Sequence, residues 1–259
     1  MVWIKATYEF ASLFSYRIPD FSSQYAISSL LPGPSTIKLA IVSTAIEITG
    51  NVEYGKEIFE LVKNADIKIR LPKKISLTTV LLKRLKEKKK PDKKSFVGER
   101  ICPICGEKTK LFLDRTDNKE KCKECWGFET TFGIRGYVYY PEEFSIYINI
   151  PEKNFKEFER ILKSIRYFGT SDSLVWCNNV NREEPSSDAI SAVENFKGEE
   201  KNLLIIPVKD INPKASFDDV NIYKKKRGRK RKEALLGKIY LIPISRQISG
   251  KNWIIYELT

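Results

Sequence analysis

The chain has 259 residues, of which 42% are apolar, and a formal net charge of +13. This length supports one large or two small domains with a hydrophobic core, and the excess of lysine and arginine predicts a polyanionic partner such as a nucleic acid. There is no histidine, which excludes histidine metal sites and the Ser-His and Cys-His dyads of many enzymes.

Neither a membrane anchor nor a secretion signal is expected. No stretch approaches the ~20 apolar residues that a membrane-spanning helix needs. The first ten residues alternate between apolar and polar types, as a strand does, and lack the apolar core of a signal peptide. Because the cysteines are spaced for a metal site and not for disulfides, we expect a cytoplasmic protein with no membrane partner.

The positive charge is concentrated in two segments. Residues 83–100 contain nine basic and three acidic residues, and residues 224–232 contain eight basic and no acidic residues. The summed positive charge of these two segments is larger than the net charge of the whole chain. The pattern predicts two local contacts with a polyanion on an otherwise near-neutral protein.

The first half of the chain opens with a strand and a long apolar helix. Strict alternation predicts a half-buried strand over residues 2–10, and residues 12–31 are expected to be irregular. Apolar residues at helical spacing predict a helix over residues 35–49. Ser35 or Thr36 is expected to cap this helix, and the free N–H groups of its first turn can hold a phosphate.

The remaining elements follow from the same periodicities. The expected elements are a helix near 54–64, a strand at 67–71, a helix at 76–90, a mobile basic arm at 88–98, a strand at 144–150, a helix at 152–168, a short strand at 174–177, a loop at 178–200, and strands at 203–208, 239–244 and 253–258. The order strand, helix, strand, occurring twice, is that of the split βαβ fold of RNA-recognition domains.

These elements predict an α+β protein in four parts. The first and second halves of a ferredoxin-like (RRM-like) domain take up residues 1–96 and 137–180. An insertion of residues 97–136 separates them, and residues 181–259 form a smaller C-terminal β-sheet region with a basic loop.

Four cysteines in the insertion have the spacing of a zinc ribbon. Cys102 and Cys105 are separated by two residues, as are Cys122 and Cys125, and sixteen residues lie between the pairs. Two residues between thiolates allow one tight turn to place both sulfurs ~2.3 Å from one ion. We expect one structural zinc ion, which leaves no open position for catalysis. Trp126, Phe128 and Phe132 are expected to form a small apolar floor beneath it, and the fifth cysteine, Cys177, to be a core residue.

Two stretches resemble a known family. Residues 14–49 contain the turn Pro32-Gly33-Pro34-Ser35-Thr36 before an apolar helix, and residues 165–176 contain an aromatic-glycine turn before a strand. Both resemble the landmarks of the CRISPR-associated RAMP subunits of the "Cas five" type. The zinc ribbon lies where that family carries a β-hairpin or thumb, and the family's glycine-rich loop is reduced here to Arg227-Gly228-Arg229.

The resemblance implies a non-catalytic, RNA-binding subunit of a Cascade-type surveillance complex. Such a subunit holds the 5′ handle of the guide RNA, caps the backbone filament of RAMP subunits and contacts the large subunit, with target DNA as a further candidate partner. The residues that we expect to contact RNA are Arg17, Ser35, Thr36, Lys38, Arg166, Tyr167, Lys224, Lys225, Lys226, Arg227, Arg229, Lys230, Arg231 and Lys232.

Two alternatives stay open at this point. The first is a metal-independent endoribonuclease that processes precursor guide RNA, as in one subtype of the family. Without histidine, its acid and base would have to be tyrosine or lysine with strongly shifted pKa values. The second is a zinc-ribbon nucleic-acid-binding factor, which the cysteines support but the two landmarks do not.

Overall fold

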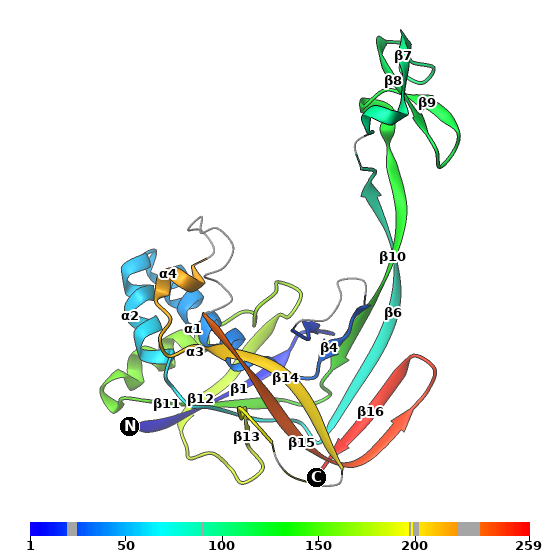
Figure 1. Ribbon diagram of the computed structural model, residues 1–259. Helices are drawn as coiled ribbons and strands as arrows, with labels where there is room; N and C mark the ends of the chain where they lie inside the picture. Colours follow the sequence, from blue (N-terminus) through cyan, green and yellow to red (C-terminus); the bar gives the residue numbers. More distant parts are fainter. Residues whose placement is uncertain (20–24, 90, 197, 199–201, 222–233) are drawn as a thin grey trace. The chain divides into compact units, whose positions relative to one another are not determined.

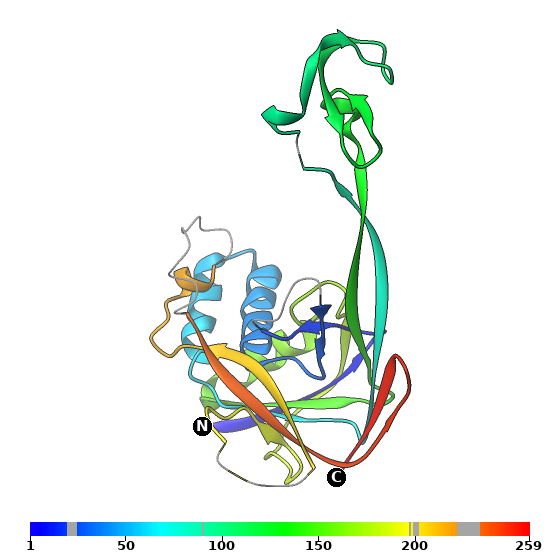
Figure 2. The ribbon, with the colours of Figure 1, turned by 45° about the vertical axis from the view of Figure 1, so that its right-hand side comes forward.

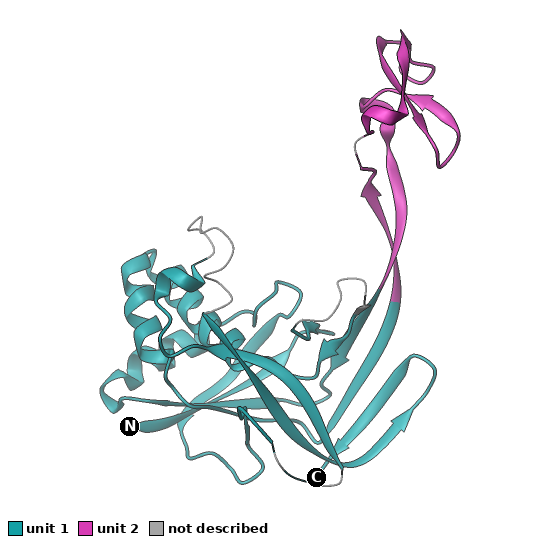
Figure 3. Ribbon diagram, in the orientation of Figure 1, with its two compact units in different colours: residues 1–80, 134–259 teal, residues 81–133 magenta. Residues whose placement is uncertain are grey.

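A computed structural model describes residues 1–19, 25–89, 91–196, 198, 202–221 and 234–259 (Figure 1). The chain divides into two compact units (Figure 3). Unit 1 contains Met1–Val80 and Ile134–Thr259, and unit 2 contains Leu81–Gly133. The strands β6 (Lys74–Glu87) and β10 (Phe128–Tyr139) each begin in one unit and end in the other. No helix in the described residues is long and apolar enough to cross a membrane.

A five-stranded sheet forms the base of unit 1. Its strands, in spatial order, are β12 (Val175–Arg182), β1 (Val2–Phe10), β11 (Phe144–Ile150), β5 (Ile67–Arg70) and β13 (Ile190–Ser191). Every neighbouring pair is antiparallel. The alternation expected in β1 and β11 is confirmed, because Ile4 pairs with Ile148 and both are fully buried. The loop expected at 178–200 is wrong in part, since β12 continues to Arg182 and β13 adds an edge strand.

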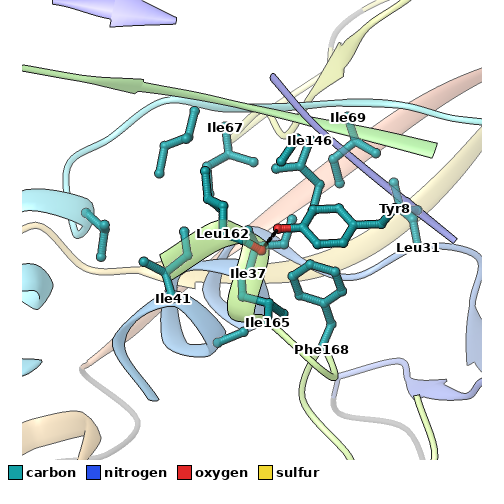
Figure 4. Packing of buried hydrophobic residues seen from close by; sticks show 14 of the residues in the cluster. Tyr8, Leu31, Ile37, Ile41, Ile67, Ile69, Ile146, Leu162, Ile165 and Phe168 are labelled. Carbon is teal, nitrogen blue, oxygen red and sulfur yellow. Dashed lines mark hydrogen bonds between the residues drawn. The ribbon is translucent and has the colours of Figure 1, made fainter. Parts of the chain in front are cut away.

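Three helices lie over one face of this sheet (Figures 1 and 2). They are α1 (Pro34–Thr49), α2 (Val52–Val62) and α3 (Phe155–Ser164), and the turn η3 (Glu152–Asn154) precedes the last. Tyr8 of β1 donates a hydrogen bond of 2.8 Å to the carbonyl of Leu162, which ties the sheet to α3 (Figure 4). Helix α3 is shorter than the expected 152–168, because Ile165 is already extended.

A second sheet of six strands completes unit 1. Its order is β14 (Leu203–Ile211), β15 (Leu235–Ser249), β16 (Trp253–Leu258), β6, β10 and β3 (Tyr25–Ala26). The last three strands of the chain were expected to form a separate, smaller sheet. That prediction is wrong, because β16 pairs with β6 from Trp253 opposite Thr78 to Glu257 opposite Lys74. Short elements β2 (Tyr16–Arg17), β4 (Ser28–Ser29) and α4 (Phe217–Val220) lie outside the two sheets.

The helix expected at 76–90 is wrong, since these residues form most of β6. The β-branched side chains of Ile75, Thr78, Thr79 and Val80 lose rotamer freedom in a helix and suit a strand. The leucines and lysines that follow have a high helix propensity, but pairing with β16 and β10 overrides it.

Unit 2 contains a three-stranded sheet of β7 (Phe96–Ile101), β8 (Lys108–Asp114) and β9 (Lys119–Lys121), with turns η1 (Lys93–Ser95) and η2 (Glu124–Trp126). The described residues of the expected mobile arm at 88–98 belong to this unit. Asp92 caps η1 through its side chain, and Phe96 begins β7. The expectation of a mobile arm is therefore wrong for these residues.

Candidate metal centre and nucleic-acid interface

The four cysteines of unit 2 bring their sulfur atoms together. All four Sγ atoms lie within 4.8 Å of one another, and those of Cys105 and Cys122 are 3.8 Å apart. A tetrahedral ion with metal–sulfur bonds of ~2.3 Å separates its sulfurs by about 3.8 Å. Cys102, Cys105, Cys122 and Cys125 are thus placed to bind a metal ion.

Local backbone geometry explains the spacing of each pair. Gly106 has φ of +76°, a left-handed conformation that favours glycine, and its N–H donates to the carbonyl of Cys102 at 2.9 Å. Cys102 in turn donates its N–H to the carbonyl of Glu107 at 2.8 Å. In the second pair, the N–H of Cys125 donates to the sulfur of Cys122 at 3.3 Å. Each turn therefore aims two thiols at the same point.

The crowded sulfurs favour a bound cation. Backbone N–H groups of Cys105 and Ile104 lower the pKa of Cys102 to about 6. The hydrogen bond with Cys122, followed by burial, raises the pKa of Cys125 to about 12. The backbone thus stabilises the thiolate of Cys102, whereas the neighbouring sulfurs disfavour a second thiolate at Cys125. A metal ion removes this repulsion and allows all four to bind as thiolates.

The apolar surroundings of the centre differ from the predicted floor. Cys102, Cys122 and Leu111 are buried together. Phe112 makes edge contacts with the rings of Phe96 and Trp126, at 5.8 and 6.4 Å between centroids. Phe128 and Phe132, expected in the floor, are 62% and 60% exposed. Alternation explains this difference, because both lie on the solvent-facing side of β10.

A buried carboxylate that sequence reasoning missed ties unit 2 together. Asp114, whose side chain is 3% exposed, forms ion pairs with Lys88 and Lys121 and accepts a hydrogen bond of 2.6 Å from the Thr116 hydroxyl. Burial alone would raise the pKa of Asp114, but these hydrogen bonds outweigh it and hold the pKa well below its usual range. Lys88 thereby has a fixed partner inside the unit.

In unit 1, the two landmark segments meet. A Cβ atom added to Gly169 would lie 3.0 Å from Cγ2 of Thr36 and 3.8 Å from the ring of Tyr16. The aromatic-glycine turn therefore packs against the first turn of α1 and against β2, which carries Arg17. The sequence shows the two landmarks, but only the tertiary fold brings them together.

We expect Gly169→Ala to lower the free energy of unfolding by about 1–2 kcal/mol, because the φ of +79° is left-handed and the added methyl group crowds Thr36. Urea titration followed by tryptophan fluorescence measures this change. The matched control is Gly237→Ala, where nothing lies within 4 Å of the added atom and φ is not left-handed. Equal effects of the two substitutions would contradict this reading of the turn.

The cap of α1 differs from the prediction. Gly33 is the N-cap residue and Pro34 begins the helix, with no side-chain cap. Ser35 is 8% exposed, and the Cα of Gly33 lies close to β14, since an added Cβ would be 3.3 Å from the carbonyl of Lys209. Packing against β14 replaces the hydroxyl cap, so the expectation that Ser35 or Thr36 caps the helix is wrong.

Lys38 is buried and has protein partners. Its side chain is 3% exposed and lies 2.9 Å from the carboxylate of Asp210, and it donates a hydrogen bond of 3.0 Å to the carbonyl of Lys63. Burial lowers the pKa of Lys38, although Asp210 acts in the opposite direction. This position joins α1 to β14 and leaves no face of Lys38 for a phosphate, which corrects its expected role as an RNA contact.

Of the remaining expected RNA contacts, Ser35 is buried and Thr36 is half-buried in the first turn of α1. The others fall into two groups. Arg17 and Arg166 are exposed, and Tyr167 is half-buried and donates a hydrogen bond of 3.2 Å to Glu47. The basic run at 224–232 lies outside the described residues. Arg135 is a charged neighbour that the sequence reading missed. It pairs with Asp172 of the aromatic-glycine turn at 2.6 Å and lies over the ring of Tyr137.

The fifth cysteine has no role in the metal centre. Cys177 is half-buried in β12 and contacts the hydrophobic core from its edge. Its thiol is near the carbonyl of Asn179, at 3.5 Å. Burial raises the pKa of Cys177, as expected for an inert, packed thiol.

Comparison with known proteins gives the family. No family model matches this sequence. The CRISPR-associated protein Cas5 of Archaeoglobus fulgidus is 37% identical over 263 residues, which cover 100% of this chain and 99% of that protein. A crystal structure of a CRISPR protein from Archaeoglobus fulgidus has 14% identity and a TM-score of 0.40, covering 100% of this chain and 92% of that chain. A chain of a CRISPR RNA-guided surveillance complex has 10% identity and a TM-score of 0.39, covering 93% and 89%. The family assignment rests on the full-length identity alone. This identity confirms the resemblance noted in the sequence. This chain belongs to the Cas5 family of CRISPR-associated proteins.

Proposed function

We propose that this chain is a non-catalytic, RNA-binding subunit of a Cascade-type surveillance complex. In this role it holds the 5′ handle of the guide RNA, caps the backbone filament and contacts the large subunit. The single observation that carries the proposal is the full-length identity to Cas5. The net charge of +13 and its concentration in two segments support a nucleic-acid partner.

We further propose that unit 1 contains a ferredoxin-like domain and that unit 2 is a zinc ribbon. The order β12, β1, β11, β5 with antiparallel neighbours supports the first. Four cysteine sulfurs within 4.8 Å of one another support Zn²⁺ over harder ions, which prefer oxygen ligands. With four protein ligands, the ion would stabilise the fold of unit 2 and leave no open position for water.

The residues that we propose for RNA binding are the exposed Arg17 and Arg166, the half-buried Tyr167 and the basic run. Arg17 and Arg166 offer guanidinium groups, and Tyr167 offers a ring for base stacking. The basic run at 224–232 supplies the largest local charge in the chain. Lys38 is left out of the set because it is buried beside Asp210.

We expect labelled CRISPR repeat RNA to bind the full chain without being cut, in the presence of EDTA, and to bind more tightly than a scrambled RNA of equal length. If about six cations of the basic run contact phosphates, the logarithm of the binding constant should fall with the logarithm of the salt concentration with a slope of about −4. Gel retardation and fluorescence anisotropy measure the two quantities.

Replacing 224–232 by serine should remove most of this slope, whereas replacing the exposed Lys56 and Lys153 by serine serves as a control for lost charge elsewhere. Equal affinity for both RNAs would contradict handle recognition. A discrete cut in the repeat would instead support the endoribonuclease. Deleting the ribbon should loosen one contact of a complex subunit but abolish the function of a zinc-ribbon factor.

A further inference from the structure

The face of the five-stranded sheet opposite the helices carries an unusual set of side chains. On β1, the buried residues Ile4, Ala6 and Tyr8 point toward the helices, so the alternate residues point to the other side. Strand register extends this face across the sheet, and we call it the outer face. Its members on three strands are Trp3, Lys5, Thr7, Ser145, Tyr147, Asn149, Lys68 and Arg70.

Aromatic rings and cations alternate across the outer face. Lys5 pairs in register with Tyr147, and Tyr147 pairs with Lys68 on the next strand. The ammonium group of Lys5 lies 6.0 Å from the ring centre of Tyr147, and that of Lys68 lies 5.7 Å from the ring of Trp3. Rings on adjacent central strands with cations beside them are the elements of a base-stacking platform.

A short acidic segment covers this platform. We call residues 183–191 the acidic strap. Glu183 pairs with Lys5 at 2.7 Å, and Asp188 pairs with Arg70 at 2.8 Å. Between these two ion pairs, the hydroxyl of Ser186 lies 3.4 Å from the hydroxyl of Tyr147.

The strap contacts Tyr147, the buried aromatic residue of the outer face. Tyr147 is 0% exposed, although it lies on the side of the sheet away from the helices. The strap then ends in the two-residue strand β13, where Ser191 pairs with Lys68. The carboxylates of Glu183 and Asp188 thus each meet a cation that could otherwise bind a phosphate.

We propose that the outer face is a binding site for single-stranded nucleic acid, and that the acidic strap occupies it in the free protein. The carboxylates of Glu183 and Asp188 take the places of phosphates on Lys5 and Arg70. Once the strap moves away, Trp3 and Tyr147 stack bases, and the half-buried Asn149 can hydrogen-bond to a base edge. This site goes beyond the proposed handle-binding residues and shares none of them.

The strap is held by contacts that a single-stranded nucleic acid can replace. Both of its ion pairs are partly exposed, with Asp188 and Arg70 near half exposure and Glu183 at 41%. Partly exposed ion pairs contribute little to stability. Its final strand has only two residues, and short edge strands open readily. Binding of a polyanion can therefore compete with the strap.

The test releases the strap by substitution in the full chain. Glu183→Gln combined with Asp188→Asn removes both carboxylates. Residues 224–232 are replaced by serine in every variant, so that failure of the proposed handle binding does not affect the result. The probes are fluorescent oligouridine and oligothymidylate of about eight nucleotides, a length within the range that one stacking platform binds.

Anisotropy should show at least about fivefold tighter binding to the strap-release variant, which corresponds to about one stacked base. The control variant, Glu53→Gln with Glu159→Gln, removes the same charge from ion pairs on α2 and α3. It should bind as the parent does. Adding Trp3→Ala to the strap-release variant should reverse the gain.

Photocrosslinking with 4-thiouridine or 4-thiothymidine probes locates the bound strand. Crosslinks to peptides of β1 and β11 in the strap-release variant would support the proposal, and their presence with only one probe would identify the preferred sugar. Three results would overturn it: unchanged affinity, an equal gain in the control variant, or a gain that Trp3→Ala leaves intact.

Discussion

Replacing Cys122 by serine should unfold residues Leu81–Gly133 and leave unit 1 folded. Among the described residues of unit 2, the buried apolar side chains are only Cys102, Leu111, Phe112 and Cys122. Burying one leucine and one phenylalanine contributes about 3–6 kcal/mol, which is small against the entropy of ordering a segment of this length. Structural zinc sites in peptides contribute about 10–16 kcal/mol, so the metal should decide whether the unit folds.

Hydrogen–deuterium exchange read by mass spectrometry resolves the two units, and native mass spectrometry counts the zinc. We expect one zinc in the parent chain, none in Cys122→Ser, and rapid exchange confined to unit 2. The control is Cys177→Ser, the same substitution at a half-buried cysteine of unit 1, which should retain the zinc. Unchanged protection of β8 and β9 after loss of the metal would show that unit 2 folds without it.

Asp210→Asn should destabilise unit 1 by about 3–5 kcal/mol, the usual result of removing one partner from a buried ion pair. Asp210 is 6% exposed, lies 2.9 Å from Lys38 and 2.8 Å from Lys238, and accepts the N–H of Ile211 at 2.8 Å. Asparagine keeps the shape but leaves Lys38 as a buried cation without its counter-charge. The junction of α1 with β14 depends on this pair.

Urea titration followed by exchange protection of α1 measures the loss. Replacing both partners, Lys38→Met with Asp210→Asn, should restore part of it, because the buried charge is then absent. Glu159→Gln removes a partly exposed partner of Lys163 on α3 and should change stability by less than about 1 kcal/mol. If Asp210→Asn behaves like this control, the pair does not hold α1 to β14.

The helices and strands with strong periodicity could be predicted because the pattern of apolar residues that indicates them lies within a few neighbouring residues. The strand at 2–10 and the helix at 35–49 are confirmed nearly to the residue, since alternation and helical spacing report burial of one side. The two cysteine pairs predicted the metal centre because two intervening residues suffice for one turn. The helix ends at Gly50, whose φ of +65° is left-handed and favours glycine.

Several of the failures depend on partners that lie far away in the chain. Residues 76–87 include both helix-favouring and strand-favouring types. Pairing with β16, more than 150 residues later in the chain, and with β10 makes them a strand. The hydroxyl cap of α1 is replaced by contact with β14. The exposure of Phe128 and Phe132 depends on which side of β10 faces solvent.

By itself, the sequence determined the family, the basic character, the four cysteines that are placed to bind a metal ion and the order of most helices and strands. These features depend on composition and on neighbours within a few residues. Only the tertiary structure decided which charged groups are available. Lys38 looks like an RNA contact in the sequence but is buried 2.9 Å from Asp210, a residue 172 positions later in the chain. Likewise, Lys5 and Arg70 meet the carboxylates of a distant strap. The strength of an ion pair depends on the distance between its charges. The tertiary fold sets that distance, and the residues next to each charge in the sequence do not.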